Sequence, residues 1–142
     1  MVDALQRARA WLRPAGFVID IRPTAEPAYL EVQLAGGTEL AGRVGDVDGR
    51  TGPSARHARA DTALATAIAR HWFAVELRRE FSFSRHGDTL DELRDHIRSD
   101  WRGAAIDDAA LGRAAALLTS EPGARARVRE QIGIARLAPR KS

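Results

Sequence analysis

Four side chains have the types and positions to contact a small-molecule substrate: Asp20, Arg22, His57 and His86. Asp20 and Arg22 stand at the carboxyl end of the first predicted strand, where open α/β sheets bind ligands. His86 follows a second long strand and could open onto the same face as Arg22. The alternatives are an ordinary ion pair at a strand end for Asp20 and Arg22, and a solvated turn residue for His86. The pattern indicates candidates for contact with a substrate, and it indicates no catalytic residue.

Metal sites and nucleophilic catalysis have little support. The 4 histidines form no i, i+4 pair and no H-E-x-x-H pattern, and the absence of cysteine removes thiolate zinc sites, disulfides and a cysteine nucleophile. The stretch "DVDGRTG" begins like a calcium loop at Asp46 and Asp48, but the twelfth position is His57 instead of a glutamate, so we interpret it as a turn. No serine lies in a G-x-S-x-G setting. We therefore expect no metal.

Composition indicates one domain over residues 1–142 with a single modest core, because 44% of the residues are hydrophobic and no low-complexity tract occurs. The 22 basic and 19 acidic residues are mostly interleaved, so the net charge of +3 does not indicate a nucleic-acid partner. No apolar run approaches the roughly 20 residues of a membrane span, and no signal peptide is recognisable. We expect no membrane partner and a cytoplasmic location.

The elements that must position the candidate residues can be predicted from apolar periodicity and caps. We expect helices over 3–13 and 61–72, two more that begin after Thr89 and Asp107, strands over 17–23, 73–84 and 125–137, and a hairpin over 28–45. The nearly continuous apolar run from Phe17 to Ile21 predicts a strand covered on both faces. Alternation along 73–84 predicts one apolar and one solvated face. The tryptophans are expected in the core.

The order of these elements, with "ALQRARAWLRPAGFVIDIRP" at its head, resembles the C-terminal half of class I S-adenosylmethionine-dependent methyltransferases. In that family a helix ending in an L-R-P-G-G-like turn feeds a strand, and the turn here is Leu12-Arg13-Pro14-Ala15-Gly16. The segment "RVREQIGIARL" is similar to the family's late antiparallel strand. The expected fold is α/β, a mixed sheet of about five strands with helices packed on it. Strands 17–23 and 73–84 are then parallel, with the last strand antiparallel between them.

The resemblance implies a methyltransferase-like domain without its own S-adenosylmethionine-binding motif. The family's glycine-rich loop would precede residue 1, and the sequence holds no G-x-G-x-G or G-x-G-x-x-G. We therefore expect no cofactor on this chain alone, and S-adenosylmethionine only where another chain completes the site. The domain would be a fragment or one half of a split enzyme that contributes the substrate side, and the isolated chain is not expected to be a competent enzyme.

Two other functions stay open. The first is a non-catalytic dimeric interaction module, and the second is an independent α+β ligand-binding fold, in which strands 17–23 and 73–84 would be antiparallel. In a methyltransferase-like half and in a dimeric module alike, the apolar strand leaves an open edge at residues 17–23. An uncovered edge of this kind aggregates. We expect a second copy or a partner chain to pair with it. The row Arg125, Arg127 and Arg129 is expected to pair across strands with Glu76 and Glu80.

Overall fold

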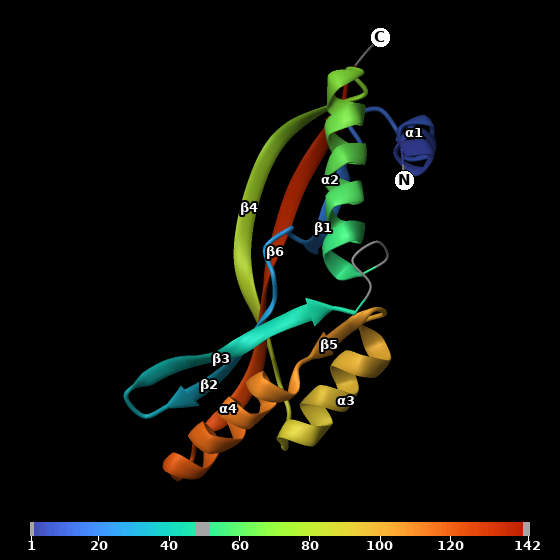
Figure 1. Ribbon diagram of the computed structural model, residues 1–142. Helices are drawn as coiled ribbons and strands as arrows, with labels where there is room; N and C mark the ends of the chain where they lie inside the picture. The colour runs from blue at the N-terminus through green and yellow to red at the C-terminus, as the bar shows by residue number, and fades with distance from the viewer. Residues whose placement is uncertain (1, 48–51, 141–142) are drawn as a thin grey trace.

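The computed structural model describes residues 2–47 and 52–140, and these form four helices and six strands (Figure 1). The order along the chain is α1 (Val2–Trp11), β1 (Val18–Pro23), β2 (Tyr29–Leu34), β3 (Gly37–Asp46), α2 (Pro53–Ala69), β4 (Phe73–His86), α3 (Leu90–Asp100), β5 (Ala104–Ile106), α4 (Asp108–Ser120) and β6 (Arg125–Pro139). The predicted caps of α3 and α4 are confirmed, because Thr89 accepts a hydrogen bond from the Glu92 amide and Asp107 accepts one from the Ala110 amide.

Strand β6 is the central strand of the sheet and pairs with three others. One of its edges pairs with β2 over residues 125–129 and with β1 over residues 132–137, and its other edge pairs with β4 along nearly its whole length. β3 and then β5 extend the sheet from β2. The fold is α/β as expected, but all six strands pair antiparallel, so the prediction of a mixed sheet of about five strands is corrected. β5 has only three residues, too few to show a periodicity.

The predicted position of the last strand is confirmed. β1 and β4 each pair antiparallel with β6, so they run parallel to one another with β6 between them. The antiparallel arrangement of residues 17–23 and 73–84, which the independent α+β alternative expects, is not what the structure has.

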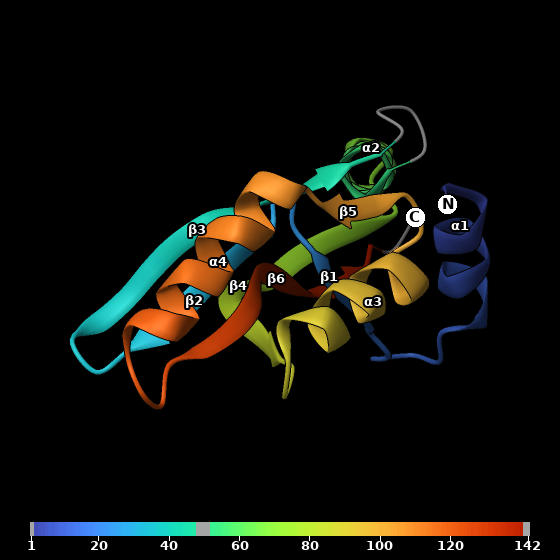
Figure 2. The ribbon, with the colours of Figure 1, turned by 60° about the horizontal axis from the view of Figure 1, so that its bottom comes forward.

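The helices pack on opposite faces of β6 at its two ends. Ala126 and Val128 belong to a core formed with β2, α3 and α4, whereas Ala135 and Leu137 belong to a second core formed with α2, β1 and Phe73. Residues of opposite parity on a strand point to opposite faces. In Figure 1, α2 accordingly lies along the upper half of the sheet and α3 and α4 lie at its lower half, and Figure 2 shows α4 against the β2–β3 hairpin.

A bulge in β4 overturns the prediction that one face of this strand is apolar. Val75 pairs with Leu137 and Leu77 pairs with Arg136, so Glu76 is an extra residue and the alternation changes face there. Phe73 and Val75 point toward α2, while Leu77, Phe81 and Phe83 point to the opposite face. The sequence cannot show this change, because both segments keep the same spacing.

The face of the upper sheet that points away from α2 carries exposed apolar side chains, with Arg79 and Arg136 among them. The apolar side chains there come from β1, β4 and the residue before β1, are 44–59% exposed, and are called the exposed patch: Phe17, Ile19, Ile21, Leu77, Phe81 and Phe83. The prediction that residues 17–23 are covered on both faces is therefore wrong for this chain by itself. No strand of the described residues pairs with the outer edge of β1.

Two further expectations are corrected. Helix α2 begins at Pro53, eight residues before the predicted cap Asp61, because Gly52 and Pro53 start it ahead of any apolar periodicity. Trp11 is 82% exposed instead of buried, while Trp72 and Trp101 are half-buried beside the two cores. None of the helices that the structure describes is long and apolar enough to cross a bilayer.

Candidate functional site

Two neighbouring cavities lie at the carboxyl end of β1 and share Pro23 in their walls. The first, called here the His57 cavity, has a volume of about 210 Å³, and the second, the Arg22 cavity, about 220 Å³. The strand end is where the sequence analysis places Asp20 and Arg22, and open α/β sheets often bind ligands at such ends. The structure brings three of the four candidate residues to these two cavities.

The Arg22 cavity lies between α2 and the sheet, and Arg22 crosses it. Nε of Arg22 contacts Oδ2 of Asp20 at 3.0 Å, and its Nη1 contacts Oδ1 of Asp61 in α2 at 2.5 Å. Burial alone lowers the pKa of Arg22, but the bonds to Asp61 and Asp20 outweigh it and raise the pKa above its ordinary value. Because two carboxylates already satisfy this guanidinium, Asp20 and Arg22 form the strand-end ion pair that was the alternative to a ligand contact.

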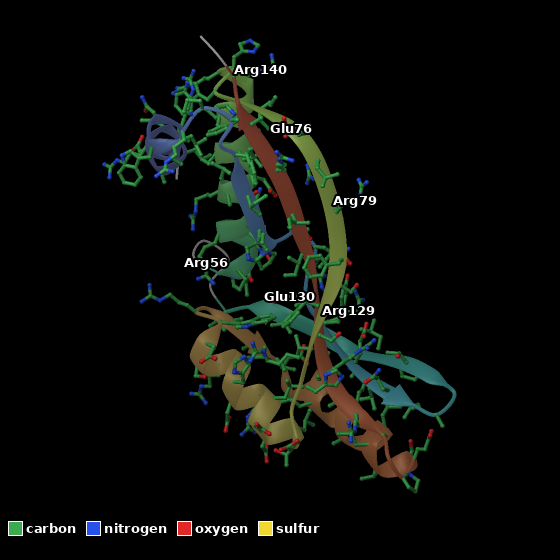
Figure 3. All side chains as sticks on the ribbon, turned by 180° about the vertical axis from the view of Figure 1, so that it is seen from behind. Arg56, Glu76, Arg79, Arg129, Glu130 and Arg140 are labelled. Carbon is green, nitrogen blue, oxygen red and sulfur yellow. The ribbon has the colours of Figure 1, made fainter. Side chains whose placement is uncertain are left out.

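The His57 cavity is built where five segments meet: the loop after β1, the end of β3, the start of α2, the end of α3 and the middle of β6. Figure 3 shows Arg56 and Glu130 at this level of the molecule, one from α2 and the other from β6. His57 stands in the first turns of α2, and Trp101 ends α3. Elements far apart in the sequence therefore supply the walls.

Burial lowers the pKa of His57 below its ordinary value of 6.5. The positive charge of Arg56 acts in the same direction, while a hydrogen bond to the backbone of Thr24 opposes both. The imidazole is therefore neutral at neutral pH and can accept a proton.

Burial raises the pKa of Glu130 above 4.5, and Arg85 offsets this only in part. Glu130 is thus a carboxyl group that holds its proton more tightly than a solvent-exposed glutamate does. A neutral imidazole and such a carboxyl line one cavity, so a proton acceptor and a protonatable carboxyl both face a bound group. Perturbed titratable groups in a cavity are typical of functional sites.

His86 lies apart from both cavities. It ends β4, pairs in register with Arg127, and its Nε2 lies 3.1 Å from Oε1 of Gln33. Arg22 pairs with Gly133 and points to the same face, but six residues of β6 separate the two positions, about 20 Å along an extended strand. His86 and Arg22 therefore cannot contact one small ligand.

Two of the three arginines in the row on β6 pair across strands, but not with the expected partners. Arg127 and Arg129 contact Glu31 of β2 at 2.9 and 2.7 Å, and Glu76 instead pairs with Arg136 at 3.1 Å. The expectation that Glu76 and Glu80 partner the row is wrong, because β2 and not β4 places a carboxylate beside these arginines.

The structure bears on the calcium-like stretch only in part. Asp48 lies outside the described residues, and Asp46 accepts a hydrogen bond from the Ser54 amide at 3.4 Å. In the described ranges no three carboxyl or histidine side chains are grouped so that they could hold a metal ion.

Sequence reasoning missed Glu130, Glu26 and Trp101 as cavity residues. Glu130 left a detectable pattern: it has the parity of Val128 and Ile132, so a carboxyl group occupies the apolar side of the strand. A charged residue on such a parity is a candidate for function, because its burial is costly. The sequence shows no comparable pattern for Glu26 and Trp101.

The chain was compared with models of protein families, with curated proteins and with solved structures, and no match was found in any of the three.

Proposed function

We propose that the chain is a methyltransferase-like domain that forms the substrate side of an active site and has no S-adenosylmethionine-binding motif of its own. The supporting observation is the arrangement of β6, which runs antiparallel between the mutually parallel strands β1 and β4, with α2 in the connection from β1 to β4. The His57 cavity at the end of β1 would take the substrate, and another chain would hold the cofactor. We place this activity in the cytoplasm.

The turn before β1 gives separate support. Ala15 has a φ of 65°, a left-handed conformation that favours glycine, and it stands where the resembled family has the first glycine of its L-R-P-G-G-like turn. The amide of Gly16 donates a hydrogen bond to the carbonyl of Arg13 at 2.8 Å, which closes the turn. The left-handed backbone at Ala15 supports the proposal, because it is the conformation that a glycine at this place would favour.

The outer edge of β1 and the exposed patch are the proposed contact surface for the cofactor-holding chain. Edge strands offer unpaired backbone groups to an incoming strand. Exposed apolar side chains beside such an edge are typical of an interface, and Arg79 and Arg136 lie among those of the patch.

Binding of S-adenosylhomocysteine tests the proposal. The reading frame upstream of this chain is searched for a strand followed by G-x-G-x-G, its product is expressed together with this chain, and titration calorimetry measures binding to the chain alone and to the pair. Binding by the pair only is the expected result. Binding by the chain alone would overturn the claim that it has no cofactor site, and a stable pair without binding would overturn the methyltransferase assignment.

A second candidate is a dimeric module without catalysis, and the outer edge of β1, with which no strand of the described residues pairs, favours it. The contact would be an antiparallel pairing of two copies of β1 centred on Ile21.

This chain has no cysteine, so Ile21→Cys carries a single thiol and would cross-link two copies paired in this register. Leu40→Cys, at an exposed position of β3 outside the patch, is the control. Rapid oxidation to a disulfide dimer by Ile21→Cys alone supports the module. Equal, slow oxidation of both variants would contradict it.

A further inference from the structure

Negative groups outnumber positive ones in the wall of the His57 cavity. The carboxyl side chains that line it are Glu26, Asp46, Asp100 and Glu130, and Arg56 is the one arginine among the described lining residues. His57 adds no charge at neutral pH, because its pKa lies below 6.5. A concave surface with this composition attracts cations and repels anions.

Several of these charged groups are held by neighbours and form a fixed wall. Nη1 of Arg56 donates a hydrogen bond to the carbonyl of Arg102 at 2.8 Å, and Asp100 contacts Nδ1 of His96 at 2.9 Å. Their places are thus set by contacts at the end of α3 and the loop after it.

Glu130 differs from these groups. Among the described residues it forms no ion pair and no side-chain hydrogen bond, and Arg85 acts on it only through space. β6 carries it on the same side as the buried Val128 and Ile132, and its pairing partner on β4 is Phe83, so the carboxyl group is half-buried among apolar side chains. A partly buried carboxylate of this kind gains most from a positively charged partner.

The remaining wall is aromatic and rigid. Trp101 lines the cavity together with Pro23, Pro27 and Pro53. An indole ring attracts ammonium groups through its negative face, and tryptophan is the best of the aromatic side chains for this interaction. A carboxylate and an indole in one small cavity therefore point to the same class of ligand.

We propose that the His57 cavity binds a small organic amine that is protonated at neutral pH, with its ammonium group against the carboxylate of Glu130 and the ring of Trp101. The volume of about 210 Å³ is below the roughly 300–1,000 Å³ of sites for drug-sized ligands, so the ligand is small. The proposal rests on the proposed function only where it names this amine as the substrate. Binding itself needs no cofactor and no second chain.

Three probes that share a ring and differ in charge test the proposal: benzylamine, benzyl alcohol and benzoate. Each is titrated into the ¹⁵N-labelled full chain, and the indole N–H of Trp101 and the amides of His57 and Glu130 are followed by NMR. Saturable shifts of these signals with benzylamine, at least tenfold weaker binding of benzyl alcohol and no binding of benzoate are expected. Equal binding of the neutral probe, or no saturable shift with benzylamine, would overturn the proposal.

Variants separate the charge from the shape of the cavity. Glu130→Gln keeps the size of the side chain and should weaken benzylamine binding at least tenfold, whereas Glu80→Gln on β4, outside the cavity, should leave it unchanged. Unfolding curves check that both variants fold. Full affinity in Glu130→Gln would overturn the proposal. Because these titrations use the chain alone, they can fail while the cofactor experiment succeeds, or succeed while it fails.

Discussion

Glu31 of β2 and Arg129 of β6 form a contact of 2.7 Å between Oε1 and Nε. The contact joins the two strands on the face opposite the core that β2 forms with α3 and α4. The other oxygen of Glu31 contacts Arg127 at 2.9 Å, and Glu31, 6% exposed, is the buried charged residue of the described chain. The guanidinium of Arg129 also lies over the ring of Tyr29, with 5.2 Å to the ring centroid. One carboxylate thus neutralises two arginines at the point where β2 pairs with β6.

Replacing Glu31 by glutamine should destabilise the fold by about 3–5 kcal/mol, because two partly buried guanidinium groups lose their counter-charge. Urea unfolding followed by circular dichroism measures the loss. Glu39→Gln on β3, at an exposed position, is the control and should change the free energy of unfolding by less than about 0.5 kcal/mol. A loss below about 1 kcal/mol in Glu31→Gln would show that water, and not the carboxylate, satisfies the arginines.

The turn before β1 predicts opposite effects at two adjacent residues. Ala15 has a φ of 65°, so Ala15→Gly should relieve strain and stabilise the fold by about 0.5–1 kcal/mol after the added freedom of the unfolded chain is subtracted. A Cβ at Gly16 would lie 2.9 Å from the carbonyl oxygen of Arg13, so Gly16→Ala should destabilise by about 1–3 kcal/mol. Thermal unfolding of the two variants measures both. Destabilisation by Ala15→Gly would contradict this backbone conformation.

Features set by local sequence could be predicted, and features set by pairing between distant segments could not. Thr89 and Asp107 cap their helices through contacts three residues away, and such contacts are visible in a single sequence. The start of α2 was missed because its first turns, around Arg56 and His57, lack an apolar stripe. The bulge at Glu76 was missed because only the register against β6 reveals it.

The candidate site follows the same rule. The position of Asp20 and Arg22 at a strand end could be predicted, because the local sequence pattern reveals it. The His57 cavity could not be predicted, because it exists only where five separate segments meet. The separation of Glu26 and Glu130 along the chain carries no information about their distance in space. The partner of the arginine row was assigned to the wrong strand for this reason also.

Adding charge to the exposed patch should reduce self-association without unfolding the chain. Leu77 is 47% exposed, so Leu77→Glu removes little buried area and should change the free energy of unfolding by less than about 1 kcal/mol. Light scattering at micromolar concentration and binding of an apolar dye should both fall. Leu40→Glu, at a 60% exposed position outside the patch, adds the same charge and should leave both unchanged. Equal effects of the two variants would assign the change to net charge alone.

Glu130 should make the stability of the fold depend on pH. Burial raises its pKa above 4.5 in the folded chain, so the folded state binds this proton more tightly than the unfolded state does. The stabilisation from the protonated carboxyl is therefore fully present below pH 4.5 and is lost as the pH rises through the raised value. Glutamine stays neutral throughout, so Glu130→Gln should be more stable than the natural chain at neutral pH, and the difference should shrink as the pH falls through the raised pKa and stay constant below 4.5. Urea unfolding of both proteins between about pH 4 and pH 8 measures this difference. A constant difference across that range would show that the carboxyl of Glu130 ionises in the folded chain as it does in water.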